Sequence, residues 1–444
     1  MKPQFLLTVA ILIGLVLGTV VGQLLFDPTW RPELGESAHA AASWLRLFDF
    51  LGQTVFMGLL TMLIVPLVFT SVVVAVTSVG DFRALGRIGG MAMLYYVSTM
   101  VVAVTIGLAV VTLLQPGAAM TGAAPGAVAE TTDAGSQLQT SAAVAAGGVL
   151  GVFDNLIRLL IPTNIVQAFA EGQTLGVIFF ALFFGVVLAS RGEQAKPIVQ
   201  LFEVGFEVLL KMVEIVLFLA PVGVFALLAW TVARVGLGVF ADAIGQYMVA
   251  VVVGLLLHGM VVLPLLLLIF ARTSPFHFAH CMRAALMTAF ATDSSSATLP
   301  VTLDCATGEG GIKRRVAGLV LPLGATVNMD GTALYEAVAV VFLAQVFGVD
   351  LSAIQLVLIA VTATLAAIGA AGIPSAGLVT MVIVVQAVNE SVLAGDPAGQ
   401  AIPLTGIGLL IGVDRMLDML RTTVNVWGDA VGAKIIDRWT PEDF

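Results

Sequence analysis

The last apolar segment of the chain, residues 401–435, carries polar side chains that recur at helical spacing. At about 100° per residue they all lie on one face of a helix. Inside a membrane, a charge near the centre costs at least about 2.5–3.5 kcal/mol unless it is paired or serves a function. An ion-pair network between helices is the structural alternative, but it would need neither the hydroxyl nor the amide in this set. We therefore interpret the stripe as a ligand-binding face, formed by Asp418, Arg421, Thr422, Asn425 and Asp429.

A second polar segment, Asn328-Met329-Asp330-Gly331, interrupts the apolar run 316–347. Asn, Asp and Gly in series favour non-helical backbone. Unwinding there would free carbonyl oxygens beside the oxygens of Asn328 and Asp330. Hard oxygen ligands without His or Cys suit an alkali cation better than a transition metal. The segment therefore predicts a cation site, with a purely structural kink as the alternative.

The charges of these segments do not balance. Two bases, Arg415 and Arg421, lie among the candidate intramembrane groups. Six acids minus two bases leave four carboxylates that must be protonated or bind cations in a low dielectric. An anionic substrate would worsen the imbalance unless cations travel with it, so the balance indicates cation coupling. The six acids are Asp293, Asp330, Glu336, Asp414, Asp418 and Asp429.

The composition places these residues in membrane helices. Of the 444 residues, 59% are hydrophobic and 11% are charged, whereas about a quarter of a soluble domain is charged. The chain is therefore expected to be an integral membrane protein. It contains no basic tract that could bind nucleic acid, and its two cysteines cannot form a disulfide scaffold.

Eight apolar blocks are long enough to be membrane spans. We interpret the first block as an uncleaved transmembrane helix, because no small-residue cleavage motif follows it. The fourth block is too long for one crossing, so we expect it to be broken or tilted. The blocks are 4–26, 50–78, 87–115, 146–189, 197–232, 244–271, 316–347 and 401–435.

Two further segments, 279–308 and 352–390, each contain two short apolar arms around a turn of small and polar residues. Each arm is too short to cross about 30 Å of hydrocarbon at about 1.5 Å per residue. A small, polar turn suits backbone that lines a wet cavity. We interpret both segments as re-entrant hairpins, with kinked full spans as the alternative. The pairing of a hairpin with a polar span, repeated twice, predicts an inverted-repeat transporter.

Basic residues set the expected orientation. Lysine and arginine occur in alternate connections, including Lys313–Arg315, whereas the connections 115–147 and 388–400 contain none. The positive-inside rule then places both termini in the cytoplasm of a multi-pass protein of the cell (inner or plasma) membrane.

These motifs resemble the dicarboxylate/amino acid:cation symporters, the family of glutamate and aspartate transporters that includes the excitatory amino-acid transporters. The resemblance covers nearly the whole chain and is weak only in 115–147. Four motifs carry it, in the family's order and spacing: Ser294-Ser295-Ser296, Asn328-Met329-Asp330-Gly331-Thr332, Ala371-Gly372-Ile373-Pro374, and Asp418 with Arg421, Thr422, Asn425 and Asp429.

The resemblance implies an all-α membrane protein with eight transmembrane helices and two re-entrant helical hairpins, working as a homotrimer of elevator type. Residues 1–86 would hold scaffold helices 1 and 2, and 116–232 scaffold helices 4 and 5 with an extracellular loop. Residues 87–115 would be transport-domain helix 3. Residues 233–444 would complete the transport domain with helix 6, hairpin 1, helix 7, hairpin 2 and helix 8.

The resemblance also implies a site for L-glutamate or L-aspartate. Asp418 would hold the ammonium, and the planar fork of Arg421 would bind the side-chain carboxylate. The α-carboxylate would lie against Thr332, Asn425 and backbone near Ser295. The full expected substrate set is Asp293, Ser294, Ser295, Met329, Thr332, Ile373, Gly377, Asp418, Arg421, Thr422 and Asn425.

Three sets of oxygen ligands for co-transported Na⁺ follow from the same resemblance. The first is Gly324, Asn328, Asn425 and Asp429. The second uses backbone carbonyls at Thr326, Ala367, Ile368 and Ala370, and the third is Tyr96, Thr99, Asn328 and Asp330.

Glu336 is the expected proton carrier, because it stands in the Thr-Ala-Leu-Tyr-Glu context of the proton-cotransporting members. A neutral Glu336 that only packs is the alternative. H⁺ stoichiometry and K⁺ countertransport stay open.

The sequence departs from the family pattern at three positions. Met100 stands where many sodium-coupled members have a hydroxyl, so the third sodium set loses an oxygen. Asp293 precedes the serine turn where archaeal members have Arg, and Arg415 lies one turn before Asp418. We expect these last two to form a compensating pair.

Other functions fit less well. Arg421 argues against neutral amino acids, and Asp418 argues against C4-dicarboxylates, which have no ammonium. An intramembrane aspartyl protease would need a close dyad, but Asp418 and Asp429 lie about 16 Å apart along one helix, and a dyad with Asp330 leaves Arg421 unexplained. A channel would not need this constellation. The sequence therefore favours a transporter over an enzyme, and we expect His258, His277 and His280 to be interfacial or packing residues.

Overall fold

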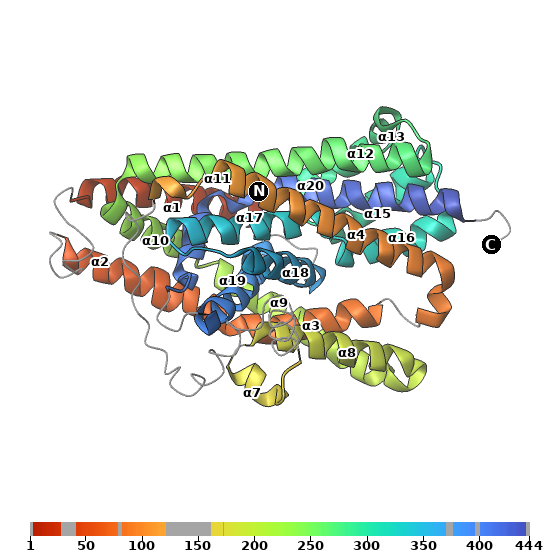
Figure 1. Cartoon of the computed structure of the whole chain (residues 1–444), viewed down its shortest axis with the longest axis horizontal. Helices are drawn as coiled ribbons and strands as arrows, with labels where there is room; N and C mark the ends of the chain where they lie inside the picture. The colour runs from red at the N-terminus through yellow and green to blue at the C-terminus, as the bar shows by residue number, and fades with distance from the viewer. Residues whose placement is uncertain are drawn as a thin grey trace.

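The computed structural model describes residues 3–27, 41–78, 82–120, 161–171, 173–369, 376–395 and 400–440. Every regular element in these ranges is a helix, which confirms the expected all-α class. The longest helical segments run roughly along the long axis of the molecule (Figure 1).

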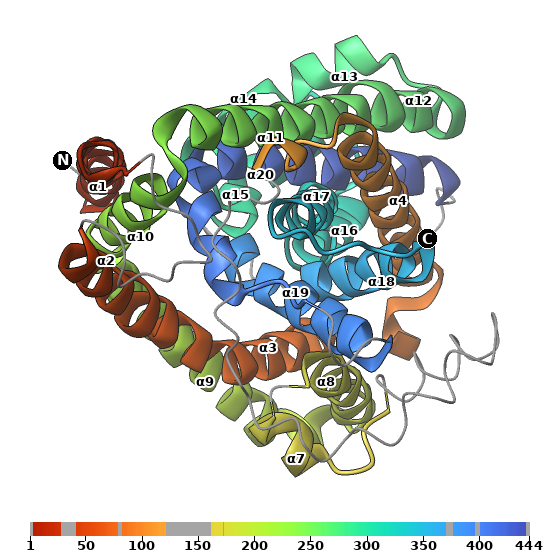
Figure 2. The same cartoon turned by 60° about the vertical axis from the view of Figure 1, so that its left-hand side comes forward.

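One group of helices forms a row along one side of the molecule (Figure 2). Within it α1 packs against α10, α10 packs against α2 and η3, and α3 packs against α8 and α9. The group comprises α1 (Pro3–Leu25), α2 (Ala42–Asp49), η3 (Phe50–Met57), α3 (Gly58–Ser78), α7 (Ile165–Ala170), α8 (Thr174–Ser190), η5 (Gly192–Ala195), α9 (Lys196–Leu217) and α10 (Ala220–Val235).

A second group surrounds α17, which lies near the middle of the molecule (Figure 2). Helix α17 packs against α4, α11, α18, α19 and α20. The bounds are α4 (Phe82–Leu114), η4 (Ala118–Met120), α11 (Leu237–Leu257), η6 (His258–Val262), α12 (Leu263–Leu266), η7 (Leu267–Ala271), α13 (Pro275–Cys281), α14 (Arg283–Thr292), α15 (Ser295–Thr307), α16 (Arg314–Val327), α17 (Asp330–Val346), α18 (Ala353–Gly369), α19 (Ala376–Gly395), η8 (Leu404–Ile407) and α20 (Gly408–Trp439).

Three apolar helical segments in the described ranges are long enough to cross a membrane: Ile88–Leu114, Leu237–Ala271 and Arg314–Val346. Several shorter apolar helices accompany them, among them Gly176–Ser190 and Ala353–Ile368. These helices support a multi-pass membrane protein, while the count of eight spans stays a prediction.

The helix boundaries follow the apolar blocks with two informative differences. The block 146–189 is broken, as expected, since α7 ends at Ala170 and α8 begins at Thr174. The block 197–232, which we expected to be one span, divides into α9 and α10. The amides of Phe218 and Leu219 bond to the carbonyls of Ile215 and Val216, three residues back, instead of continuing the four-residue α-helical ladder.

Each segment expected to be a hairpin contains two helices that pack against each other, but only the first pair has the short arms expected. Helix α14 has 10 residues and packs against α15, which has 13. At about 1.5 Å per residue neither can cross about 30 Å of hydrocarbon. Helix α18 packs against α19 in the same way. Helix α19, in this second pair, has 20 residues, about 30 Å at about 1.5 Å per residue, so the expectation that both of its arms are too short to span is wrong for this helix. The turn between α18 and α19, residues 370–375, lies outside the described residues.

Three glycines allow α1 and α10 to pack closely side by side. A Cβ at Gly14, Gly18 or Gly22 would collide with the backbone carbonyls of α10 residues Pro221, Phe225 and Ala229. All three glycines are buried and four residues apart, so they form one small-residue stripe. Such stripes let helix backbones approach each other in membranes. The N-terminal helix is thus fixed on the row by backbone contact.

The glycine stripe predicts a position-specific loss of stability. Gly18→Ala should lower the free energy of unfolding by about 1–3 kcal/mol, because the added methyl overfills a close-packed interface. Gly205 in α9 is a matched control, since nothing lies within 4 Å of a Cβ built there. Gly205→Ala should leave stability unchanged or raise it by up to about 1 kcal/mol through helix propensity. Thermal unfolding of both purified variants in detergent measures the difference, and equal midpoints would contradict the close contact.

Candidate functional site

The expected break between two buried half-helices is present. Helix α16 ends at Val327, α17 begins at Asp330, and Asn328 and Met329 between them are non-helical. The amide of Gly331, one of the unpaired donors at the start of α17, donates to Asn425 Oδ1 at 2.7 Å. The break is thus stabilised by the amide side chain of α20 that the sequence placed on the polar stripe.

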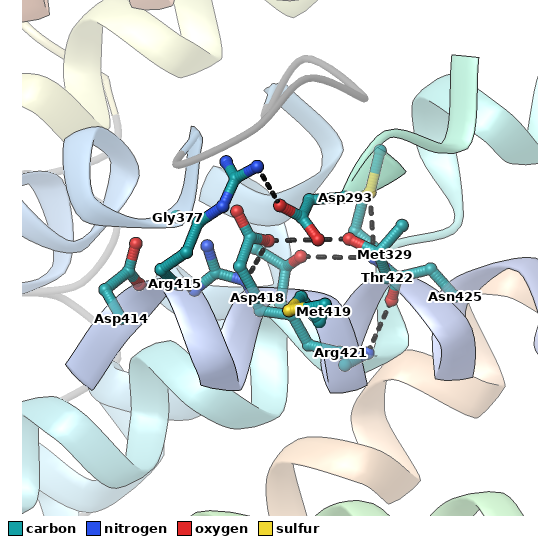
Figure 3. Close-up of polar contacts among 12 residues, drawn as sticks. Asp293, Met329, Gly377, Asp414, Arg415, Asp418, Met419, Arg421, Thr422 and Asn425 are labelled. Atoms are coloured by element: carbon teal, nitrogen blue, oxygen red, sulfur yellow. Dashed lines mark hydrogen bonds and ion pairs between the residues drawn. The ribbon is translucent and has the colours of Figure 1, made fainter. Parts of the chain in front are cut away.

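Arg421 lies at the centre of the buried polar face of α20 (Figure 3). Its side chain is 1% exposed. Its Nε donates to Asp418 Oδ1 at 2.8 Å, and its Nη1 donates to Asp414 Oδ1 at 3.2 Å. The guanidinium carbon also lies 4.3 Å from the centre of the Tyr335 ring. Two carboxylates and an aromatic face together offset the cost of burying this cation.

Helix α19 contacts the same guanidinium. A Cβ at Gly377, at the start of α19, would approach Arg421 Nη1 to 2.6 Å and Cζ to 2.8 Å. Only glycine leaves room for this approach. Arg421 is therefore enclosed by α17, α19 and α20. Ile373, the other residue expected from the second hairpin, lies outside the described residues.

The turn between α14 and α15 is joined to α20 by an ion pair. Asp293 Oδ2 lies 2.7 Å from Arg415 Nη2, with Asp293 1% and Arg415 32% exposed (Figure 3). This pair is confirmed as expected from the sequence. Asp293 also ends α14 in the left-handed region, at φ 50°, a conformation that Asp tolerates better than most residues.

The neighbouring serines form the start of the next helix. Ser294 Oγ accepts a hydrogen bond from the amide of Ala297 at 3.1 Å and so caps α15. Ser295, the first residue of α15, is 3% exposed. The serine turn is thus a helix N-terminus that lies beside α20, because both α14 and α15 pack against that helix.

The structure brings most of the other expected substrate residues together. Thr422 Oγ1 donates to Asp418 Oδ1 at 3.4 Å. Asn425 Nδ2 donates to Thr332 Oγ1 at 3.2 Å and lies 3.3 Å from Met329 Sδ. Asn425 therefore contacts the helix break, and Asp418 and Thr422 lie next to each other on the same helix.

The first expected sodium set is gathered around Asp429, which is 2% exposed. Asn328 Nδ2 donates to Asp429 Oδ1 at 3.0 Å. A Cβ at Gly324 would collide with the same carboxylate oxygen. Gly324, Asn328 and Asp429 are therefore adjacent, and Asn425 lies one turn earlier on α20.

The third expected set converges on the same break. Thr99 Oγ1 lies 3.4 Å from Asn328 Oδ1, and the Tyr96 hydroxyl donates to the carbonyl of Val320 at 2.7 Å. Asp330 is 0% exposed. Met100, which replaces a hydroxyl in this set, is also fully buried.

The second expected set lies where α16 packs against α18. Thr326 is near the end of α16, and its Oγ1 donates to the carbonyl of Leu323 at 3.0 Å. Ala367 and Ile368 belong to the last turn of α18. Ala370 lies outside the described residues.

Glu336 is fully buried one turn after Thr332 on α17. The hydroxyl of Thr380, on α19, donates to Glu336 Oε1. The other oxygen, Oε2, has no hydrogen-bond partner among the described residues. The expected proton carrier is therefore in contact with α19.

Sequence reasoning missed the roles of two residues. It counted Asp414 among the acids without placing it in the site, although position 414 lies on the stripe, seven residues before Arg421. It also took His258 for an interfacial or packing residue and did not foresee a polar contact for this buried side chain. His258 is 0% exposed, and its Nε2 lies 3.0 Å from Asp330 Oδ2. The surplus of buried acids was the signal, because a buried carboxylate needs a donor.

The described residues contain no group of three or more His, Cys, Asp or Glu side chains that could hold a metal ion. The candidate cation ligands are instead amide, hydroxyl and single carboxylate oxygens, a donor set that suits an alkali cation.

Comparison with known proteins identifies relatives over almost the whole chain. The sequence model of the sodium:dicarboxylate symporter family matches residues 7–439. Excitatory amino acid transporter 3 of Mus musculus is 35% identical, over 98% of this chain and 85% of its own length. Excitatory amino acid transporter 2 of the same species is 36% identical, over 95% and 77%. An excitatory amino acid transporter of Caenorhabditis elegans is 34% identical, over 99% and 88%.

The Asp293–Arg415 pair predicts an asymmetric double-mutant cycle. Arg415→Ala should lower the thermal unfolding midpoint more than Asp293→Ala, because it leaves a buried carboxylate unpaired while Arg415 alone can reach solvent. The double alanine should recover part of the loss, with a coupling energy of about 0.5–3 kcal/mol. The control is the Arg283–Glu309 pair, whose side chains are 50% and 61% exposed, and which should couple by at most about 1 kcal/mol. Strict additivity at Asp293 and Arg415 would show that they do not interact in solution.

Proposed function

The chain belongs to the sodium:dicarboxylate symporter family, and from this we propose that it is a secondary active symporter that takes up L-glutamate or L-aspartate together with Na⁺. One observation carries the proposal. A buried arginine, Arg421, lies one helical turn from a buried acid, Asp418, beside a helix break lined with oxygen ligands. An acidic amino acid offers complementary groups to both side chains.

Substrate recognition would work by exchange of partners. Arg421 and Asp418 are paired with each other at 2.8 Å. The side-chain carboxylate of the substrate would take up donors of Arg421, and its ammonium would take up oxygens of Asp418. Thr332, Asn425 and the backbone at Ser295 would hold the α-carboxylate. Neither charged side chain would then be left buried without a partner.

The two other substrate classes each leave one of these groups unsatisfied. A neutral amino acid offers nothing to the guanidinium of Arg421. A C4-dicarboxylate has no ammonium for Asp418. An unpaired charge in a dry site costs several kcal/mol, so the constellation favours acidic amino acids over both.

Sodium is proposed as cargo, bound in the three oxygen sets and released on the cytoplasmic side. The buried carboxylates of Asp330 and Asp429 support this assignment, because a cation neutralises each of them during transport. Asn328 is shared between the first and third sets, which would couple their occupancy.

The arrangement of the helices supports an elevator mechanism. The row formed by α1, α2, α3 and α8–α10 would be the scaffold and the trimer contact. The group around α17, with α4 and α11–α20, would move through the membrane with the substrate. Both hairpins lie against α20 or α17 and would close the site, and both termini would face the cytoplasm of the cell membrane.

A proton would travel on Glu336. The side chain is buried near Arg421, and Thr380 connects it to hairpin 2. Loading or unloading the carboxyl would therefore be linked to the position of that hairpin. Whether K⁺ is countertransported is tested by the outward K⁺ gradient in the uptake experiment below.

The function is tested by uptake of labelled L-aspartate and L-glutamate into proteoliposomes. Inward Na⁺, inward H⁺ and outward K⁺ gradients are imposed one at a time. We expect concentrative uptake of an acidic amino acid that requires the Na⁺ gradient. Uptake of alanine or succinate in preference to both acidic amino acids, or uptake that ignores Na⁺, would overturn the proposal.

Arg421→Cys should abolish uptake of acidic amino acids and allow uptake of serine or alanine. Each charge-assisted hydrogen bond lost is worth roughly 1.5–3 kcal/mol, and the substrate carboxylate would be buried without a partner. Arg283→Cys is the matched control, because that side chain is half exposed in its ion pair with Glu309. Unchanged aspartate affinity in Arg421→Cys would refute the assignment of this residue.

Glu336→Gln should preserve substrate binding and exchange, because the amide keeps the size and can still accept from Thr380. Net uptake should lose its dependence on an inward proton gradient, since glutamine cannot carry a proton. Glu309→Gln, a change at a side chain that is 61% exposed, should keep the wild-type dependence. If wild-type uptake already ignores the proton gradient at fixed Na⁺, Glu336 carries no proton and sodium alone drives transport.

A further inference from the structure

A buried histidine and a buried aspartate meet beside the helix break. His258 and Asp330 are both 0% exposed, and His258 Nε2 lies 3.0 Å from Asp330 Oδ2. Among the described residues, the other carboxylate oxygen, Oδ1, has no hydrogen-bond partner. A fully buried carboxylate oxygen without a donor is costly unless it serves as a ligand.

The backbone around His258 departs from the α-helix at this point. The helical run Leu237–Ala271 changes to a π-turn, η6, that begins at His258. The carbonyl of Gly259 in this turn accepts a hydrogen bond from Trp427 Nε1 at 3.0 Å. Single π-turns inside α-helices frequently occur at functional sites. The turn is thus attached to α20 two residues before Asp429, and it presents the imidazole to Asp330.

The same small region contains the ligands of the third proposed sodium set. A Cβ at Gly428 would lie 2.9 Å from Asp330 Oδ2 and 3.0 Å from Asn328 Nδ2. Both side chains therefore meet the same point of α20. Thr99 approaches Asn328 from α4 at 3.4 Å. Asp330 is the carboxylate in this set, so its side-chain rotamer sets the position of the negatively charged oxygen that would bind a cation.

We propose that His258 is a positioning residue for the cation site: its Nε2–H holds Asp330 Oδ2 and thereby directs Oδ1 toward the cation. The inference deepens the proposed function and rests on it. A neutral imidazole with its proton on Nε2 suffices for this donation, and its Nδ1 has no hydrogen-bond partner among the described residues. Groups that orient a metal ligand in this way typically change metal affinity 10–100-fold when they are removed.

The test compares variants that differ in the donor. His258→Leu replaces the imidazole donor with an apolar side chain that still fills the space. His258→Gln retains an N–H donor on a side chain of similar length. In proteoliposomes, His258→Leu should raise the sodium concentration for half-maximal aspartate uptake about 10–100-fold. The aspartate KM at saturating sodium should stay within about threefold. His258→Gln should recover much of the sodium affinity, and His280→Leu, at an exposed histidine, should behave as wild type.

A second measurement does not depend on transport. Sodium should raise the thermal unfolding midpoint of the wild type in detergent, and a higher concentration should be needed for the same rise in His258→Leu. If His258→Leu does not fold, His258→Asn replaces it, because its shorter amide cannot reach Asp330. Unchanged sodium dependence in the folded variant, or equal losses in the Gln and Leu variants, would overturn the inference. Failure of the proposed function would appear differently, as wild-type uptake that needs no sodium.

Discussion

The buried guanidinium of Arg421 is a charge that the surrounding helices must neutralise, and the arrangement of the site follows from that requirement. Asp414 and Asp418 supply two carboxylates from the same helix, each within 3.2 Å of a guanidinium nitrogen. Tyr335 supplies an aromatic face from α17, and Gly377 lets α19 approach without a side chain. Arg421 is paired with two carboxylates although one would balance its charge, so some of its N–H donors can transfer to the carboxylate of an arriving substrate.

The helix break beside Arg421 is the second consequence of burying polar groups. An interrupted helix exposes donors and acceptors that water cannot reach. Asn425 accepts from the amide of Gly331, and Asn328 donates to Asp429. At the break itself, Asp330 Oδ1 is a buried carboxylate oxygen that has no hydrogen-bond partner in the described part of the chain. The break is therefore both stabilised by α20 and left short of positive charge.

The sequence predicted the features that depend on local pattern. The helical period of α20, the unwinding at Asn328 and Met329, and the short lengths of α14 and α15 follow from spacing and residue type. Charge compensation alone predicted the pairing of Asp293 with Arg415. The surplus of buried acids indicated that Asp330 and Glu336 need donors, but the choice of His258 and Thr380 as those donors was not predictable, because it depends on how whole helices pack. The kink between α9 and α10 was missed because a shift from four-residue to three-residue hydrogen bonds leaves no mark on hydrophobic periodicity.

The glycine stripe on α1 has a mechanical consequence for the row of helices. Gly14, Gly18 and Gly22 fit against Pro221, Phe225 and Ala229, so both sides of the interface repeat every four residues. A slide of α1 by one, two or three residues would force a larger side chain into a space that holds only a hydrogen atom. A slide of four residues, about 6 Å along the axis, would align two of the glycines again but would bring Ala10 or Phe26 to the third contact. The interface therefore fixes a single register of α1 against α10.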